Sequence, residues 1–155
     1  MSKAAATGKM MSLENGGHEH HFTLPVYWED TDAGGIVYYA NYLKFTERAR
    51  TDLLRLLDIH QQSLMEEEGL NFVVRDCRIE YLKSARLDDL LTVRTRLGDL
   101  KGATLRMYQD VYCADELLIT SEVRVACLQK SGRPARFSPQ IKDKFASMIN
   151  LSGAG

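Results

Sequence analysis

The chain has 155 residues, of which 45% are hydrophobic and 26% are charged. These values indicate one globular domain with enough apolar residues for a sizeable core. The 20 basic and 21 acidic residues give a formal net charge of −1. The overall charge therefore gives no attraction to nucleic acid or to an anionic membrane. No apolar run approaches the ~20 residues of a transmembrane helix, and residues 1–19 lack the apolar core of a secretory signal. We therefore expect a cytoplasmic protein.

The first 19 residues are rich in Gly, Ala, Ser and Lys and show no periodicity. This composition predicts a flexible N-terminal tail, followed by a folded domain over residues 20–150. Residues 21–28 are strand-like, and Pro25 within them favours an edge position or a bulge.

Helical spacing begins at Tyr42. Apolar side chains then recur every three or four residues, which predicts an amphipathic helix with one buried side; they are Phe45, Ala49, Leu53, Leu56 and Leu57. Residues 59–68 predict a short second helix that Gly69 ends.

Beyond Gly69 the periodicity changes to two, which predicts strands over residues 73–81, 91–97, 105–113 and 117–127. The connections at residues 98–102 and 114–116 are short enough for hairpins. Ser138 and Pro139 then supply an N-cap and a first helical residue for a terminal helix. The predicted fold class is α+β, in which an antiparallel sheet of five strands wraps a long central helix.

The cysteines and the N-terminal histidines predict no metal site and no disulfide. Cys77, Cys113 and Cys127 are far apart and in phase with apolar neighbours, so we expect them to pack in the core. The histidines at 18, 20 and 21 are spaced like metal ligands, but they adjoin the predicted tail and are expected to be solvated.

A segment with the residue types of an active site lies between the first strand and the long helix. Asp32 is a carboxylate that can act as nucleophile or general base. Gly34 and Gly35 allow a tight turn and let a substrate approach the backbone. Backbone N–H groups at the helix N-terminus can stabilise a developing oxyanion, which suits acyl transfer. The alternative is that Asp32 simply caps the turn, a role that we expect for Asp30.

Several stretches together resemble the hotdog-fold acyl-CoA thioesterases of the 4-hydroxybenzoyl-CoA thioesterase family, most of all its Tol-Pal-associated branch. The resemblance is carried by WEDTDAGGIVYYANY at residues 28–42 and FTERAR at 45–50. It continues through FVVR at 72–75, IEYL at 79–82, ARLDD at 85–89 and RP at 133–134, and it spans roughly residues 20–145.

The resemblance implies hydrolysis of an acyl-CoA or acyl-carrier-protein thioester, with a hotdog fold and no metal or organic cofactor, because coenzyme A is part of the substrate. Asp32 matches the catalytic carboxylate of the family, and the backbone N–H of Tyr39 matches its oxyanion donor. Val37 and Tyr38, in the same segment, are expected to contact substrate. The Tol-Pal-associated relatives usually carry His at the position of Tyr39, and a phenol is a poor base at neutral pH.

Four basic residues at strand ends or in loops are candidates for binding the phosphates of coenzyme A. They are Lys83, Arg86, Arg133 and Arg136. The alternative is that these charges serve only solubility.

The predicted sheet has an open edge, which favours a homodimer at least, and the resemblance implies dimers or tetramers with active sites between subunits. Glu47 on the long helix is a possible second carboxylate, although a helix-face contact with Arg50 accounts for it. Two other functions stay open. A hotdog dehydratase needs a histidine in the turn or helix entry, and a non-catalytic acyl-binding or envelope-associated scaffold needs no catalytic carboxylate.

Overall fold

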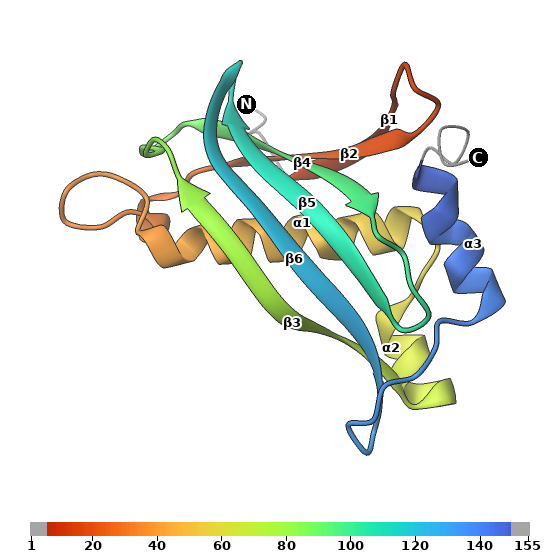
Figure 1. Ribbon diagram of the computed structural model, residues 1–155. Coiled ribbons are helices and arrows are strands. Elements are labelled where there is room, and N and C mark those ends of the chain that lie inside the picture. Colours follow the sequence, from red (N-terminus) through yellow and green to blue (C-terminus); the bar gives the residue numbers. More distant parts are fainter. Residues whose placement is uncertain (1–5, 150–155) are drawn as a thin grey trace.

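The computed structural model describes residues 6–149 as a strongly curved antiparallel sheet that wraps one long helix (Figure 1). The strands are β1 (Thr7–Ser12), β2 (His18–Pro25), β3 (Leu70–Tyr81), β4 (Leu90–Gly98), β5 (Thr104–Cys113) and β6 (Glu116–Gln129). The helices are η1 (Trp28–Asp30), η2 (Tyr39–Asn41), α1 (Tyr42–Leu56), α2 (Gln61–Ser63), η3 (Leu64–Glu68) and α3 (Pro139–Met148). The predicted α+β class is confirmed, but the sheet has six strands rather than five.

Helix α1 lies in the concave side of the sheet and forms the centre of the core. Its residues Phe45, Ala49 and Leu53 have no solvent exposure, and they follow the predicted stripe. Leu56 departs from that stripe because it is 48% exposed, while the neighbouring Leu54 is buried. The buried stripe fixes the rotation of α1 about its axis, since any other rotation would expose these side chains.

The sheet order β1-β2-β4-β5-β6-β3 confirms both predicted hairpins and places β3 at an edge. β3 pairs with β6, the last strand of the chain, instead of with β4, which follows it in sequence. Because β3 is an edge strand, most of its side chains are accessible. Cys77 is therefore exposed, and the expectation that all three cysteines pack in the core is wrong for this residue.

The short helices follow their sequence signals. α2 and η3 together cover the predicted second helix, and Gly69 ends it in the left-handed region with a φ of 65°. Ser138 caps α3, because its side-chain oxygen accepts a hydrogen bond from the Ile141 N–H at 3.2 Å. Among the described helices, none is long and apolar enough to cross a membrane.

The predicted flexible tail over residues 1–19 is wrong where the structure describes it. Strand β1 pairs antiparallel with β2, from Thr7 opposite Thr23 to Ser12 opposite His18. Residues 1–5 and residue 150, the last of the predicted domain, lie outside the described residues. The segment lacks the alternation of apolar and polar residues that would have indicated a strand.

Strand β1 lies over a buried hydrogen bond between His20 of β2 and Asp52 of α1. His20 has no solvent exposure, and its Nε2 lies 2.7 Å from Oδ2 of Asp52. Gly8 of β1 passes so close that a Cβ there would lie 1.7 Å from the same Asp52 oxygen. The expectation of a solvated histidine is therefore wrong for His20, whose pKa is lowered by burial although Asp52 opposes this shift.

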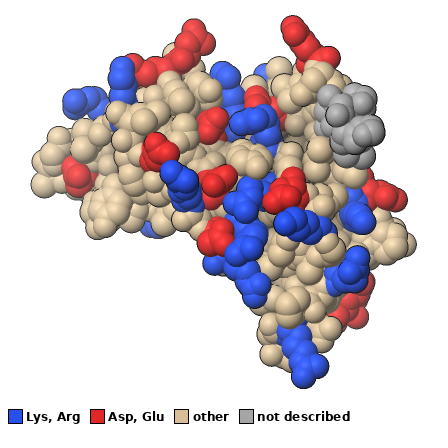
Figure 2. Space-filling model, viewed as in Figure 1, with Lys and Arg blue, Asp and Glu red and all other residues tan. Residues whose placement is uncertain are grey.

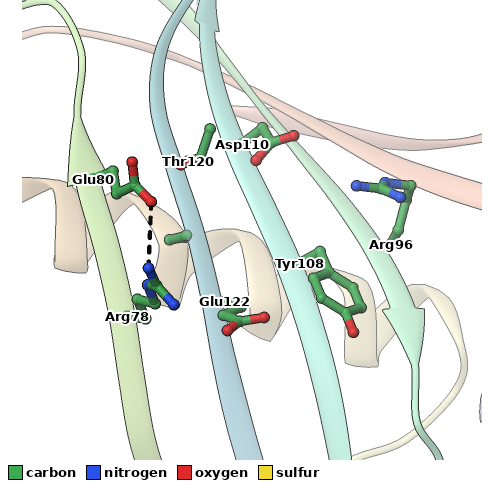
Figure 3. A pocket seen from close by; sticks show the side chains of 8 residues that line it. Arg78, Glu80, Arg96, Tyr108, Asp110, Thr120 and Glu122 are labelled. Atoms are coloured by element: carbon green, nitrogen blue, oxygen red, sulfur yellow. Dashed lines mark ion pairs between the residues drawn. The ribbon is translucent and has the colours of Figure 1, made fainter.

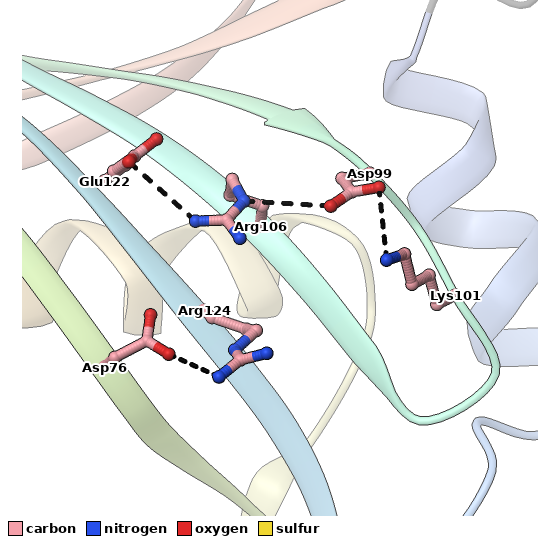
Figure 4. A network of polar contacts seen from close by, with 6 residues as sticks. All are labelled: Asp76, Asp99, Lys101, Arg106, Glu122 and Arg124. Atoms are coloured by element: carbon pink, nitrogen blue, oxygen red, sulfur yellow. Dashed lines mark hydrogen bonds and ion pairs between the residues drawn. The ribbon is translucent and has the colours of Figure 1, made fainter.

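The outer face of the sheet is polar and carries charges of both signs, which Figure 2 shows intermixed. Arg106 lies 3.8 Å from both Asp99 and Glu122, and Arg124 pairs with Asp76 across β6 and β3 (Figure 4). Such exposed pairs contribute little stability individually. The alternation of this polar face with the buried face explains the periodicity of two along the strands.

We predict that Leu53→Ala lowers the free energy of unfolding by roughly 2–5 kcal/mol, because it removes a fully buried side chain at the centre of the core. The matched control on the same helix is Leu56→Ala, whose effect should stay below about 0.5 kcal/mol. Urea unfolding of the two variants measures the difference. Equal losses would contradict the observed rotation of α1.

We also predict that His20 makes the protein less stable in mild acid. The folded protein holds His20 below its ordinary pKa of 6.5, so the unfolded chain binds the proton more readily, and stability falls as the pH drops below about 6.5. His20→Gln should flatten this part of the stability curve, measured by urea unfolding between pH 5 and 7.5. The control His60→Gln removes a histidine whose side chain is 60% exposed, and it should leave the slope unchanged. An unaltered slope in His20→Gln would contradict the assignment.

Candidate active site

Asp30 holds together the segment that leads from β2 to α1. Its carboxylate Oδ2 accepts the Tyr27 N–H at 2.8 Å, and its backbone oxygen accepts both the Tyr38 N–H at 3.0 Å and the Asn41 amide at 2.9 Å. Asp30 is 7% exposed, which agrees with the predicted role in shaping the turn. The carboxylate thus fixes the chain before the following turn, and the backbone oxygen fixes the chain after it.

Asp32 lies in the exposed turn between these two anchored points. Its Oδ1 accepts the Gly34 N–H at 2.8 Å, and its own N–H donates to the Ile36 oxygen at 2.8 Å. Gly35 has a φ of 81°, a conformation that favours glycine. The turn-capping role considered for Asp32 is thus present. It occupies one carboxylate oxygen, and no hydrogen bond to Oδ2 occurs within residues 6–149.

The turn is attached to the loop that follows β3. The Val37 N–H donates to the Ala85 oxygen at 2.9 Å, and Ile36 forms a bridge with Arg86. The Val37 side chain is only 3% exposed and belongs to the core, and the expected contact of this residue with a substrate stays a prediction. Its role is to connect the Asp32 turn to the sheet.

The helix entrance supplies unpaired backbone donors close to Asp32 in the chain. Tyr39 begins η2, and α1 continues directly from it. The first N–H groups of a helix have no partner inside the helix, and no backbone acceptor for the Tyr39 N–H occurs in the described part of the chain. This N–H is therefore available to an anionic oxygen, as the family resemblance implies.

Four tyrosines surround the helix entrance. The Tyr39 ring lies 5.0 Å from the Tyr38 ring and 5.9 Å from the Tyr81 ring, and all three are 43–60% exposed. Tyr42 lies beneath them, 2% exposed, and its hydroxyl accepts the Ala85 N–H at 2.9 Å. Burial raises the pKa of both Tyr42 and Tyr81. The cluster forms an aromatic wall beside the Asp32 turn.

No pattern in the sequence predicted a site role for Tyr42 or Tyr81. Tyr81 comes from β3, 39 positions after Tyr42, and the two rings lie 5.8 Å apart. Because the two tyrosines are far apart in the sequence, their contact depends on how β3 pairs with β6. The sequence did contain one indication of this role, an aromatic residue at the end of a predicted strand, because binding residues often lie where a strand passes into a loop.

The four candidate phosphate-binding residues do not come together within one chain. Lys83 and Arg86 follow β3 beside the Asp32 turn, whereas Arg133 and Arg136 follow the opposite end of β6. β3 has 12 residues, so its ends lie roughly 35 Å apart. Lys83 forms an ion pair with Glu116. One chain thus brings only Lys83 and Arg86 near Asp32.

A hollow of about 340 Å³ lies on the outer face of the sheet (Figure 3). It is lined by polar side chains of β3, β4, β5 and β6, including Arg78 and Glu80, which lie 3.9 Å apart. Burial raises the pKa of Asp110 here, against the effect of Arg96. None of the helices described over residues 6–149 begins at this hollow, so they offer it no N-terminal backbone donors for acyl transfer.

Comparison with known proteins agrees with the fold and identifies the family. Residues 26–145 match the thioesterase-like superfamily, so the chain belongs to this family. The acyl-CoA thioesterase YbgC of Haemophilus influenzae is 45% identical over 134 residues, which are 86% of this chain and 96% of that protein. An acyl-CoA thioester hydrolase YbgC of Escherichia coli is 42% identical over 77% of this chain and 86% of its own length.

Solved structures show the same architecture. A probable thioesterase from Bartonella henselae superposes with a TM-score of 0.74 at 38% identity, covering 77% of this chain and 99% of that one. The hotdog fold expected from the resemblance is thereby confirmed. Strands β1 and β2 both precede the residues that match the family.

We predict that Asp30 and Asp32 differ in their effect on stability. Asp30→Ala leaves the Tyr27 N–H without its acceptor and should lower the free energy of unfolding by about 1–3 kcal/mol. Asp32→Asn keeps an oxygen for the Gly34 N–H and should change it by less than about 0.5 kcal/mol. Thermal and urea unfolding test this. A large loss in Asp32→Asn would show that its charge supports the fold.

Proposed function

We propose that this protein hydrolyses acyl-CoA thioesters at the Asp32 turn. The proposal rests on two groups that lie in one short segment. One oxygen of the Asp32 carboxylate has no hydrogen bond within residues 6–149, and the Tyr39 N–H at the helix entrance has no backbone acceptor there. Relatives of 42–45% identity are named acyl-CoA thioesterases or thioester hydrolases. The geometry and the relatives therefore support the same chemistry.

In the proposed reaction Asp32 acts on the thioester carbonyl in one of two ways. It attacks the carbon to form an anhydride that water then opens, or it accepts a proton from a water that attacks directly. In both cases the carbonyl oxygen becomes negative and accepts the Tyr39 N–H, together with the positive end of the α1 dipole. The coenzyme A thiolate leaves and is protonated, so one water is consumed and a free acid and a thiol are formed.

The surroundings of the turn suit a coenzyme A thioester. Lys83 and Arg86 place positive charge beside it, and the wall of Tyr38, Tyr39 and Tyr81 offers an apolar surface to the acyl group. The proposal leaves open whether coenzyme A or acyl carrier protein presents that group. It requires no metal or organic cofactor, which stays a prediction, as do the cytoplasmic location and an association with the Tol-Pal system.

We also propose that the active form contains at least two subunits. The outer edge of β3 is open, and its Val74 is 44% exposed. Arg133 and Arg136 follow the far end of β6, so about the length of β3, roughly 35 Å along the strand, separates them from Lys83 and Arg86 of their own chain. They can meet the same ligand as Lys83 and Arg86 only from another subunit. Light scattering and equilibrium sedimentation test whether the protein is a homodimer or homotetramer.

No feature of the described residues favours a dehydratase. The four histidines of the chain are at positions 18, 20, 21 and 60, outside the turn and the helix entrance, and His20 is buried beneath β1. A non-catalytic acyl-binding scaffold is distinguished by its lack of turnover. The following experiment separates it from an enzyme.

The test is release of free thiol from acetyl-, butyryl-, palmitoyl- and benzoyl-CoA by the wild type and by Asp32→Asn. We predict that the variant lowers kcat by about a hundredfold or more, because it removes the charge and keeps the turn. The control is Glu29→Gln, which removes an exposed carboxylate three positions earlier. Near-normal turnover in Asp32→Asn would exclude Asp32, whereas acyl-CoA binding without turnover in the wild type would indicate a scaffold.

A further inference from the structure

The backbone of Ala85, in the loop that follows β3, contacts both parts of the candidate active site. Its carbonyl oxygen accepts the Val37 N–H at 2.9 Å, and its N–H donates to the hydroxyl of Tyr42 at 2.9 Å. Val37 ends the turn that carries Asp32. Tyr42 begins α1, three positions after Tyr39. One residue therefore connects the segment of the proposed carboxylate to the segment of the proposed oxyanion donor.

The loop that carries Ala85 is itself anchored to the sheet. The Val26 N–H, just after β2, donates to the Asp89 oxygen at 2.9 Å, and the Arg86 N–H donates to Oδ2 of Asp89 at 2.9 Å. Ala85 has no solvent exposure and packs in the same core cluster as Tyr42. Because the loop is held at these points, it can transmit the position of α1 to the turn.

The hydroxyl of Tyr42 is held in place by the packing of its ring. Tyr42 is 2% exposed, and its ring lies 5.8 Å from both the Phe45 ring and the Tyr81 ring. The contact with Phe45 is edge-to-face, with an angle of 84° between the ring planes. A ring in such close packing keeps its orientation. The hydroxyl therefore presents a fixed acceptor to the Ala85 N–H.

Apolar packing alone does not set the distance between the Asp32 turn and the helix entrance. The burial of Phe45, Ala49 and Leu53 fixes the rotation of α1, but apolar contacts are non-directional. A hydrogen bond, in contrast, has a preferred length and angle. A misplacement of about 1 Å at a reacting group can lower a rate by about a hundredfold. The directional link through Ala85 therefore bears on the proposed chemistry.

We infer that Tyr42 is a positioning residue for the hydrolysis at the Asp32 turn, an inference that rests on the proposed function. Its hydroxyl holds the turn and the Tyr39 N–H at a fixed separation through Ala85, without touching the substrate. A hydroxyl that only satisfied the buried Ala85 N–H would contribute to stability alone. A positioning hydroxyl contributes to kcat as well and leaves KM unchanged.

The test compares kcat and KM of three variants of the full protein, on the acyl-CoA that the wild type hydrolyses fastest. Tyr42→Phe keeps the ring and should lower kcat by about tenfold or more, with little change in KM. Two controls should keep the kcat of the wild type. Tyr108→Phe removes the same hydroxyl from the hollow on the outer face, and Ile141→Val removes a buried methyl group from α3. Unfolding curves check that each variant is folded.

Amide hydrogen exchange tests the same link without turnover. The Val37 amide should exchange about tenfold faster or more in Tyr42→Phe than in Ile141→Val, whose lost packing lies in the other core cluster. Equal Val37 exchange in these two variants, a kcat of Tyr42→Phe like that of the wild type, or an equal fall of kcat in Ile141→Val would each overturn the inference. Absence of turnover in the wild type, with faster Val37 exchange in Tyr42→Phe, would overturn the proposed function and support the link from Tyr42 to the turn.

Discussion

The burial of one helix in a curved sheet is the constraint on which the rest of the structure depends. Phe45, Ala49 and Leu53 have no contact with solvent, and together they fix where α1 lies and how it is rotated. The N-terminus of α1 is thereby held at one end of the sheet. The Asp32 turn can then be small, because Asp30 and Val37 need only connect it to elements that already have fixed positions.

The same burial accounts for the polar groups inside the molecule. The Gln109 amide nitrogen donates to Thr46 and Thr95, and its oxygen accepts a hydrogen bond from Arg50. At the other side of the helix, Asp52 contacts His20 under β1. Each of these groups has its partner only because α1 lies at a fixed distance from the strands, so core packing and site geometry are one arrangement.

Local patterns in the sequence were sufficient for most of the fold but not for long-range pairing. The spacing of apolar residues indicated α1, the short connections indicated both hairpins, and Ser138 with Pro139 indicated the cap of α3, because each of these depends on neighbours in the chain. Strand β1 was missed, since it is stabilised by β2 and lacks a regular alternation of its own. The burial of His20 depends on Asp52, which is 32 residues away. Of the candidate site, the segment around Asp32 was recognisable, but the separation of Arg133 from it follows only from the pairing of β3 with β6.

We propose that the Asp32 turn and the entrance of α1 together bind the carbonyl group of an acyl thioester. Nuclear magnetic resonance of the ¹⁵N-labelled protein can detect this binding, with a coenzyme A ketone in which a CH₂ group separates the sulfur from the carbonyl. We expect a downfield shift of the Tyr39 amide proton, because the ketone oxygen becomes its acceptor. If the ketone binds but the Tyr39 and Gly34 amides stay unchanged and only resonances elsewhere shift, the carbonyl group is not bound at this turn.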